Sequence, residues 1–188
     1  MTLRLFAGLC LVCLLSSGAF AGAEGDPSSY KLEGNGGLEI QVPADPAHPW
    51  NMVKQDDVLL VLERPPMPEK GLPFGLLIVA AEQGPETTNG IDWKRIKDNI
   101  IGAATKSGSD LKLSLAGSWD VGKDLREKGA EAQKLTGTMT ANEREVNVAM
   151  VALVAPGRLV TISELGPKDG APSVYEKVAR SVRLPAAP

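Results

Sequence analysis

The sequence predicts an α+β domain with an antiparallel β-sheet and helices packed on its faces, an α/β/α sandwich. Three observations lead to this fold class. Several short segments alternate apolar and polar residues or are apolar throughout, and both patterns are typical of β-strands. Hairpin-like connections with turn residues separate most of these segments, which favours antiparallel pairing. Two other segments repeat their apolar residues with the period of an α-helix, and such helices bury their apolar stripe against a sheet.

The chain begins with the pattern of a secretory signal peptide, residues 1–21. One arginine precedes an apolar run at 5–15, and the sequence AFA at 19–21 fits the small-x-small cleavage pattern. We expect cleavage after Ala21, with Ala23 as the alternative site. The apolar run is too short to cross a bilayer, which takes about 20 residues. The mature chain is therefore expected to have no transmembrane segment and to reach the bacterial periplasm or the extracellular space.

Both cysteines, Cys10 and Cys13, lie in this apolar run, so the mature chain is predicted to be cysteine-free. Leu9 and Val12 precede them, whereas a lipid-anchored cysteine would follow a small residue. A cysteine-free domain excludes disulfides, thiolate zinc sites and a cysteine nucleophile. The formal net charge is −3 and no basic block stands out, which disfavours nucleic acid and anionic membrane as partners.

A single domain is predicted over residues 38–184, after a flexible leader at 22–37 and before a short tail at 185–188. The leader is rich in glycine, serine and acidic residues. The first half of the domain contains three predicted strands, at 38–42, 58–63 and 74–82. The first alternates cleanly and so is expected to be half-buried, while the last is apolar on both faces, as in a central strand.

A helix is predicted to follow the run TTNG at 87–90, with Thr88 or Asn89 as its N-terminal cap. The segment KSG at 106–108 ends it with a cation in the last turn and a glycine beyond. Its apolar residues share one face of a helical wheel. They are Trp93, Ile96, Ile100, Ala103 and Ala104.

Four further strands are predicted in the second half of the domain, at 111–115, 132–140, 146–154 and 159–165. The first has Leu111, Leu113 and Leu115 on one face and polar residues on the other. Residues 118–129 fit either a loop or one helical turn. The second and third strands pair around Asn142-Glu143, and Pro156-Gly157 forms the next turn.

The segment PSVYEKVARSVRL at 172–184 predicts a closing helix. Ser173 and Glu176 have the spacing of a capping box. Three valines fall on one face: Val174, Val178 and Val182. We expect this face to dock on the sheet, because a helix of about three turns is marginal in water on its own. The outer face carries Glu176, Lys177 and Arg180.

Three segments resemble PsbP-like and Ran-binding Mog-type domains. GLEIQVPAD at 37–45, followed by Trp50, looks like the strand, proline, small residue, acid and tryptophan at the start of those domains. EAQKLTGTM at 131–139 looks like one of their strands, and VYEKVARSVRL at 174–184 looks like their closing helix. The chain departs from the pattern of these domains at two points. Val182 stands where phenylalanine is usual, and PAHP displaces the tryptophan.

The resemblance covers about residues 37–184 in element order and points to the bacterial exported branch of this family. It implies a PsbP/Mog-like α+β fold. Family members include a photosystem extrinsic subunit and a nuclear-transport regulator, and most of them are binding or assembly proteins. They share no catalytic motif, so the resemblance implies no catalytic, cofactor-binding or metal-binding residue in this chain. No cofactor is expected.

The single histidine, His48, lies between prolines and is interpreted as a solvated loop residue whose replacement by alanine leaves stability unchanged. A metal site would need further histidines or several convergent acids. Asp56-Asp57 fits a polar turn better than a cation site, and GNGG at 34–37 precedes a strand and is not a phosphate loop.

The tryptophans and one proline-rich segment remain as candidates for recognition. Trp93 and Trp119 are predicted to pack in the core. Trp50 is either a core residue, which we favour, or an exposed apolar spot. The segment PPMP at 65–68 is either a stiff loop, which we favour, or a polyproline stretch that a partner recognises. In the recognition interpretation, the partner-binding residues are Trp50, Pro66 and Met67.

Three functions are compatible with these patterns. The favoured one is an exported, non-catalytic domain that binds a protein partner or a small ligand in the cell envelope. A hydrolase that uses carboxylates such as Asp56, Asp92 or Asp120 is the second, although no paired-acid spacing favours it. The third is a structural subunit of the envelope.

Overall fold

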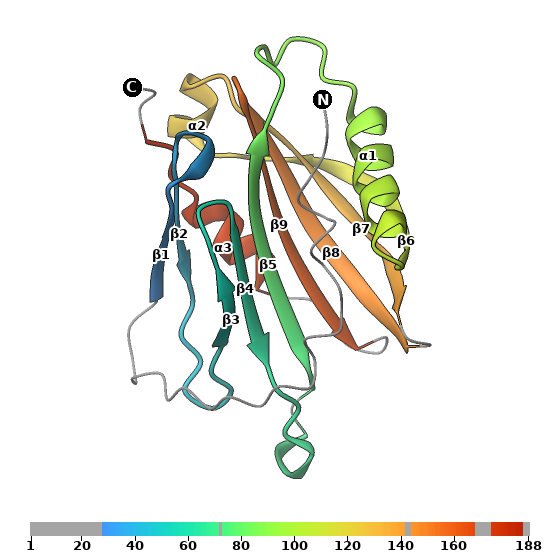
Figure 1. Ribbon diagram of the computed structural model, residues 1–188. Helices are drawn as coiled ribbons and strands as arrows, with labels where there is room; N and C mark the ends of the chain where they lie inside the picture. Colours follow the sequence, from blue (N-terminus) through green and yellow to red (C-terminus); the bar gives the residue numbers. More distant parts are fainter. Residues whose placement is uncertain (1–27, 72, 142–143, 168–173, 186–188) are drawn as a thin grey trace.

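Antiparallel strands form one curved seven-stranded sheet in the part of the chain that the structure describes (Figure 1). This computed structural model describes residues 28–71, 73–141, 144–167 and 174–185. The strands of the sheet are β3 (Asn51–Gln55), β4 (Leu59–Arg64), β5 (Gly75–Gln83), β6 (Asp110–Trp119), β7 (Glu131–Ala141), β8 (Arg144–Ala155) and β9 (Arg158–Pro167). Their order is β3-β4-β5-β9-β8-β7-β6. One meander, β3-β4-β5, thus pairs with a second meander, β6-β7-β8-β9, through β5 and β9. The predicted antiparallel α+β architecture is confirmed.

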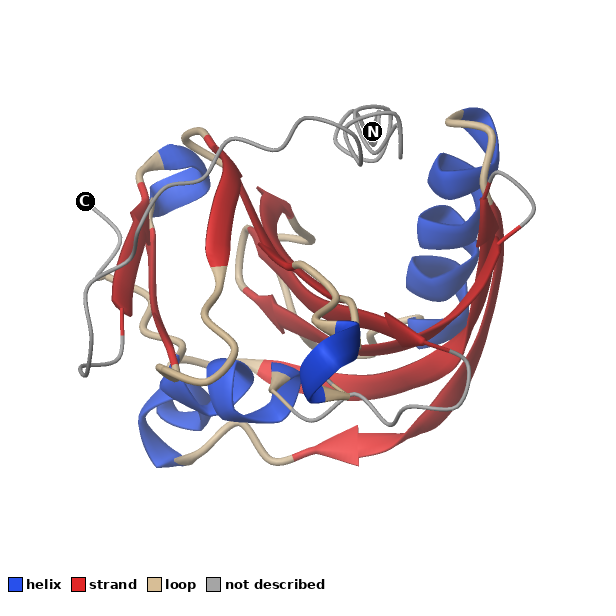
Figure 2. Ribbon diagram, turned by 90° about the horizontal axis from the view of Figure 1, so that it is seen from below, coloured by secondary structure: helices blue, strands red, loops and turns tan. Residues whose placement is uncertain are grey.

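The two faces of the sheet carry separate apolar cores. Directly paired residues of antiparallel strands point to the same face, and Leu77 pairs with Glu164 while its neighbour Ile78 pairs with Ser163. Leu77 belongs to the core that includes helix α3 (Tyr175–Ser181) and α2 (Lys123–Glu127). Ile78 belongs to the core that includes α1 (Trp93–Lys106). Helices therefore cover both faces (Figure 2).

A two-stranded ribbon corrects the predicted leader. Within residues 22–37, Ser28–Leu32 form strand β1, which pairs with β2 (Leu38–Val42). A short 3₁₀ turn at Gly34–Gly36 connects them, and its Asn35 side chain donates a 2.8 Å hydrogen bond to the Ala81 carbonyl. Leu32 is fully buried in the α3-side core. The polar composition of SSYKL conceals this strand, since only Leu32 is fully buried and Tyr30 packs against the core in part.

The middle helix, α1, begins later than predicted. Asp92 is its N-cap and accepts a 2.9 Å hydrogen bond from the Arg95 amide, whereas Thr88 and Asn89 lie outside the helix. A carboxylate here also complements the helix dipole. Trp93 is half-buried against the core and not fully enclosed as expected. The helix ends as predicted, with Lys106 in its last turn.

The second meander follows the predicted strands, with longer ends. β6 continues to Trp119, which is buried as expected, and α2 takes the helical alternative for residues 118–129. Leu115 differs from expectation because it is 43% exposed, beside an irregularity in the β6–β7 register on the edge strand.

Helix α3 docks on the sheet as predicted, with all three valines buried. Its inner face is joined to β2 through Ser181, whose hydroxyl accepts a 2.8 Å hydrogen bond from the Gln41 amide and donates to the Val178 carbonyl. Lys177 and Arg180 are exposed, and Glu176 is half-buried. Glu176 Oε1 accepts a 2.6 Å hydrogen bond from Lys134 Nζ.

Some expectations fall outside the described residues. These are the signal peptide with its cleavage sites and cysteines, the turn at 142–143, the cap at Ser173 and the last residues of the tail. No helix in the described residues is both long and apolar enough to cross a membrane. A second 3₁₀ turn, Pro68–Lys70, follows β4.

Candidate functional site

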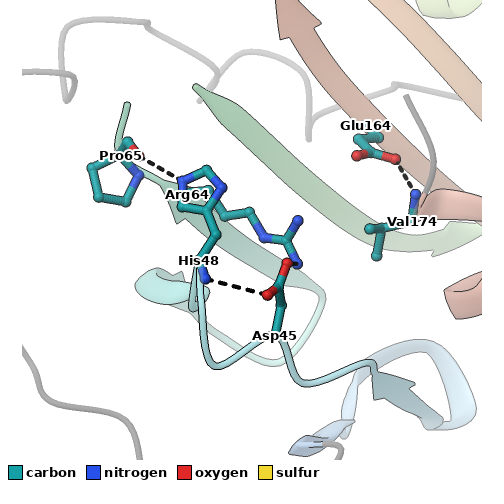
Figure 3. Close-up of polar contacts among 6 residues, drawn as sticks. All are labelled: Asp45, His48, Arg64, Pro65, Glu164 and Val174. Carbon is teal, nitrogen blue, oxygen red and sulfur yellow. Dashed lines mark hydrogen bonds and ion pairs between the residues drawn. The ribbon is translucent and has the colours of Figure 1, made fainter. Parts of the chain in front are cut away.

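The proline-rich loop between β2 and β3 folds back onto the end of β4. Its sequence DPAH starts a turn with aspartate first and proline second, a strong turn signature. The His48 amide donates to the Asp45 carbonyl at 3.0 Å and lies 3.2 Å from Asp45 Oδ1. This local geometry aims the imidazole of His48 at the segment that follows β4 (Figure 3).

His48 is buried, with 5% of its surface exposed, so its interpretation as a solvated loop residue is wrong. Its Nε2 lies 2.7 Å from the carbonyl oxygen of Pro65, and Nε2 must carry the proton to donate to that oxygen. The ring is buried because the loop folds over β4, a contact across 17 positions in the chain.

Replacing His48 with alanine is therefore expected to destabilise the domain by about 1–3 kcal/mol. The change leaves the Pro65 carbonyl without its donor and opens a small cavity. Thermal unfolding followed by circular dichroism measures the loss. Ala47→Ser, at an exposed neighbouring position, is the control and should stay within about 0.5 kcal/mol. A melt of His48→Ala equal to that of the control would restore the solvated interpretation.

Arg64, the last residue of β4, lies beside this histidine loop. Its side chain is 14% exposed, and its guanidinium lies 3.4 Å from Asp45 Oδ2 and 4.1 Å from the ring centre of Trp50. Burial lowers the pKa of Arg64, while the charges of Asp45 and Glu164 oppose that shift. Arg64 Nε and Trp50 Nε1 are both buried and have no hydrogen-bond acceptor among the described residues. Trp50 is thus half-buried under Arg64, which matches the favoured core interpretation only in part.

Glu164 links this cluster to α3. It lies on β9 with 7% of its surface exposed, and its Oε2 accepts hydrogen bonds from the amides of Val174 at 2.6 Å and Tyr175 at 3.0 Å. A carboxylate that receives the first free amides of a helix satisfies both the hydrogen bonds and the helix dipole. Figure 3 draws this contact together with the Asp45–Arg64 pair, and the charge of Glu164 acts on Arg64. We call Asp45, His48, Trp50, Arg64 and Glu164 the polar cluster.

Next to the polar cluster, strand β3 exposes two large apolar side chains. Met52 is 54% exposed and Val53 is 42% exposed. β3 is an edge strand that pairs only with β4 in the described sheet, and its register shifts between Met52 and Lys54. This β-bulge leaves Val53 without a directly paired residue, and bulges commonly redirect side chains at sheet edges. We call Met52 and Val53 the β3 edge surface.

The three predicted partner-binding residues flank this edge. Trp50 immediately precedes β3, while exposed Pro66 and half-buried Met67 follow the paired strand β4. Their role stays a prediction. The exposure of Met52 and Val53 could not be predicted from the sequence, because two consecutive apolar residues do not reveal whether they face solvent. Arg64 and Glu164 were not predicted either, since they resemble ordinary strand-end charges in the sequence.

The three carboxylates considered for a hydrolase lie in separate turns. Asp56 accepts hydrogen bonds from the amides of Val58 and Leu59 before β4. Asp92 caps α1, and Asp120 accepts from the Gly122 amide beside α2. Each carboxylate thus has a local structural role. Asp56 precedes β4 and Asp120 follows β6, and these two strands lie toward opposite edges of the sheet.

Comparison with known proteins shows the fold. No protein-family model and no curated protein sequence matches the chain. The solution structure of cyanobacterial PsbP (CyanoP) from Synechocystis sp. PCC 6803 aligns with a TM-score of 0.53 and 16% identity. The alignment covers 88% of this chain and 98% of that one. The domain therefore has a PsbP-like α+β fold.

A crystal structure of a protein from Bacteroides thetaiotaomicron VPI-5482 aligns with a TM-score of 0.49 and 13% identity. That alignment covers 82% of this chain and 47% of the other, so this chain spans about half the length of that protein.

Proposed function

We propose that this PsbP-like domain is an exported, non-catalytic binding protein that engages a protein partner in the cell envelope through the β3 edge surface. The observation that supports it is the exposure of Met52 and Val53 side by side on an edge strand. Exposed apolar side chains grouped at one place commonly mark an interaction site. The signal-peptide pattern of residues 1–21 supports the envelope location.

An edge strand offers a partner more than apolar contact. Its outward amides and carbonyls provide a row of hydrogen-bonding groups to which an extended segment can add as a further strand. Side chains such as Met52 and Val53 then provide selectivity. Methionine suits this role because its flexible side chain adapts to the shape of a partner.

The polar cluster supports the proposal by holding the start of β3 in place. Trp50 precedes β3 directly and is covered by Arg64, which Asp45 contacts in turn. His48 anchors the same loop to Pro65. A surface fixed before binding loses less conformational entropy when the partner arrives. In this proposal, the buried charges have a positioning role and perform no chemistry.

Site-specific photocrosslinking in the host tests the proposal. A photoreactive residue at position 53 is expected to give one discrete protein adduct, and Met52→Asp is expected to abolish it. The matched control is position 115, since Leu115 has nearly the same exposure as Val53 (43% against 42%) but lies on the opposite edge strand. Met52→Asp should change the melting temperature little, because the side chain is exposed.

Two outcomes would contradict the proposal. Equal crosslinking from positions 53 and 115 would show that any exposed apolar residue gives adducts. An adduct with twice the mass of the chain would show self-association at this edge in place of a different partner.

A further inference from the structure

A groove with a positively charged rim lies beside α2 and the C-terminal end of α3. Its volume is about 780 Å³, and its lining comes from β2, α2 and the segment from Arg180 to Pro185. The side chains of Leu125, Val182 and Leu184 are buried beneath it. Four cations line it: Lys123, Lys128, Arg180 and Arg183. Two acids, Glu39 and Asp124, also line it, so the lining has an excess of positive charge in a chain whose net charge is −3.

Three of the four cations form no ion pair within 4 Å in the described part of the chain. Lys128 Nζ donates to the Leu184 carbonyl at 2.5 Å. The Arg180 guanidinium lies 4.6 Å from the ring centre of Trp119. Arg183 exchanges backbone hydrogen bonds of 2.8 and 2.9 Å with Glu39, and these hold its position beside β2. Among the four, Lys123 is the one with an ion pair in the described residues, 3.7 Å from Glu127. Arg180 lies close enough to Asp120 and Glu176 for its charge to act on both carboxylates.

We propose that this groove binds an acidic, extended segment of a protein. Its cations are distributed over α2, the residue that follows it, the last turn of α3 and the segment beyond, which suits carboxylates spaced along a peptide. A single small anion would be held better by donors that converge on one point. Arg180 and Lys128 already have fixed contacts, so ordering them on binding costs little entropy.

A membrane surface fits this groove less well. Interfacial binding combines cations with apolar side chains that insert into the lipid. The large apolar side chains exposed in the described residues are Met52, Val53 and Leu115, and none of them lines the groove. The groove is also separate from the β3 edge surface, so either proposal can fail without the other.

Fluorescence anisotropy with a labelled poly-glutamate peptide tests the groove. The purified domain is expected to bind this peptide, with affinity falling as salt screens the charges. Arg180→Glu/Arg183→Glu should weaken binding by about tenfold or more, since attraction becomes repulsion at two positions. Lys123→Glu/Arg183→Glu should do the same and leaves the Arg180–Trp119 contact intact, in case the first variant unfolds.

The control variant, Arg95→Glu/Lys177→Glu, makes the same charge change at two exposed residues outside the groove and should stay within about twofold of the unaltered domain. Four results would overturn the proposal. The first three are no binding of poly-glutamate, an equal loss of binding in the control variant, and equal binding of a poly-glutamine peptide. The fourth is that the groove cations are needed for binding to phosphatidylglycerol vesicles or inorganic phosphate but not for binding to poly-glutamate.

Discussion

Replacing Val178 with aspartate is expected to abolish cooperative folding of the domain. The Val178 side chain has 0% exposure and lies in the core between α3 and the sheet. An unpaired carboxylate at this place costs several kcal/mol, and it also removes the apolar contacts of the valine. A domain has a total margin of only about 5–15 kcal/mol. Circular dichroism should show a broad or absent thermal transition, and the variant should bind a dye that reports exposed apolar surface.

The next residue in the chain provides the control for that experiment. Lys177 is exposed on the outer side of α3, so Lys177→Asp should change the free energy of unfolding by no more than about 0.5 kcal/mol. A sharp and unshifted melt for Val178→Asp would mean that α3 is an appendage to the fold.

The second large effect is expected from Gly137→Ala in β7. Gly137 pairs with Leu113 of β6, and a Cβ atom here would collide with the carbonyl group of Lys112. The obstacle is backbone, which cannot move without breaking the β6–β7 ladder. We expect a loss of about 3 kcal/mol or more in the free energy of unfolding, measured by urea denaturation.

Gly166→Ala is the matched substitution in β9. An added Cβ atom at Gly166 meets nothing within 4 Å among the described residues. We therefore expect a change of less than about 1 kcal/mol there. If both variants lost the same stability, the collision at Lys112 would not be the cause.

The sequence predicted most elements because local patterns determine them. The valines of α3 repeat with the helical period, and their burial is confirmed. The N-terminal contacts of the same helix were missed, because they come from Glu164, ten positions earlier on β9. A capping box is a local signal, whereas this contact exists only after the sheet has formed.

In the candidate site, too, the sequence predicts local structure but not contacts between distant residues. The turn at Asp45 follows from the Asp-Pro sequence, but the burial of His48 depends on where that turn meets Pro65. β1 was missed for a similar reason, since its partner β2 and the core around Leu32 stabilise a segment with little strand pattern of its own.

The pairing of β5 with β9, which we call the seam between the two meanders, has a consequence for how quickly the domain folds. Within each meander, strands pair with their neighbours in sequence, whereas β5 and β9 pair residues as far apart as Leu76 and Leu165. Both cores cross this seam, so neither is complete until it closes. Closing a long loop lowers the chain entropy before stabilising contacts can form, and folding rates fall as contacts become more distant in sequence. We therefore expect β5–β9 pairing to be the slow step of folding.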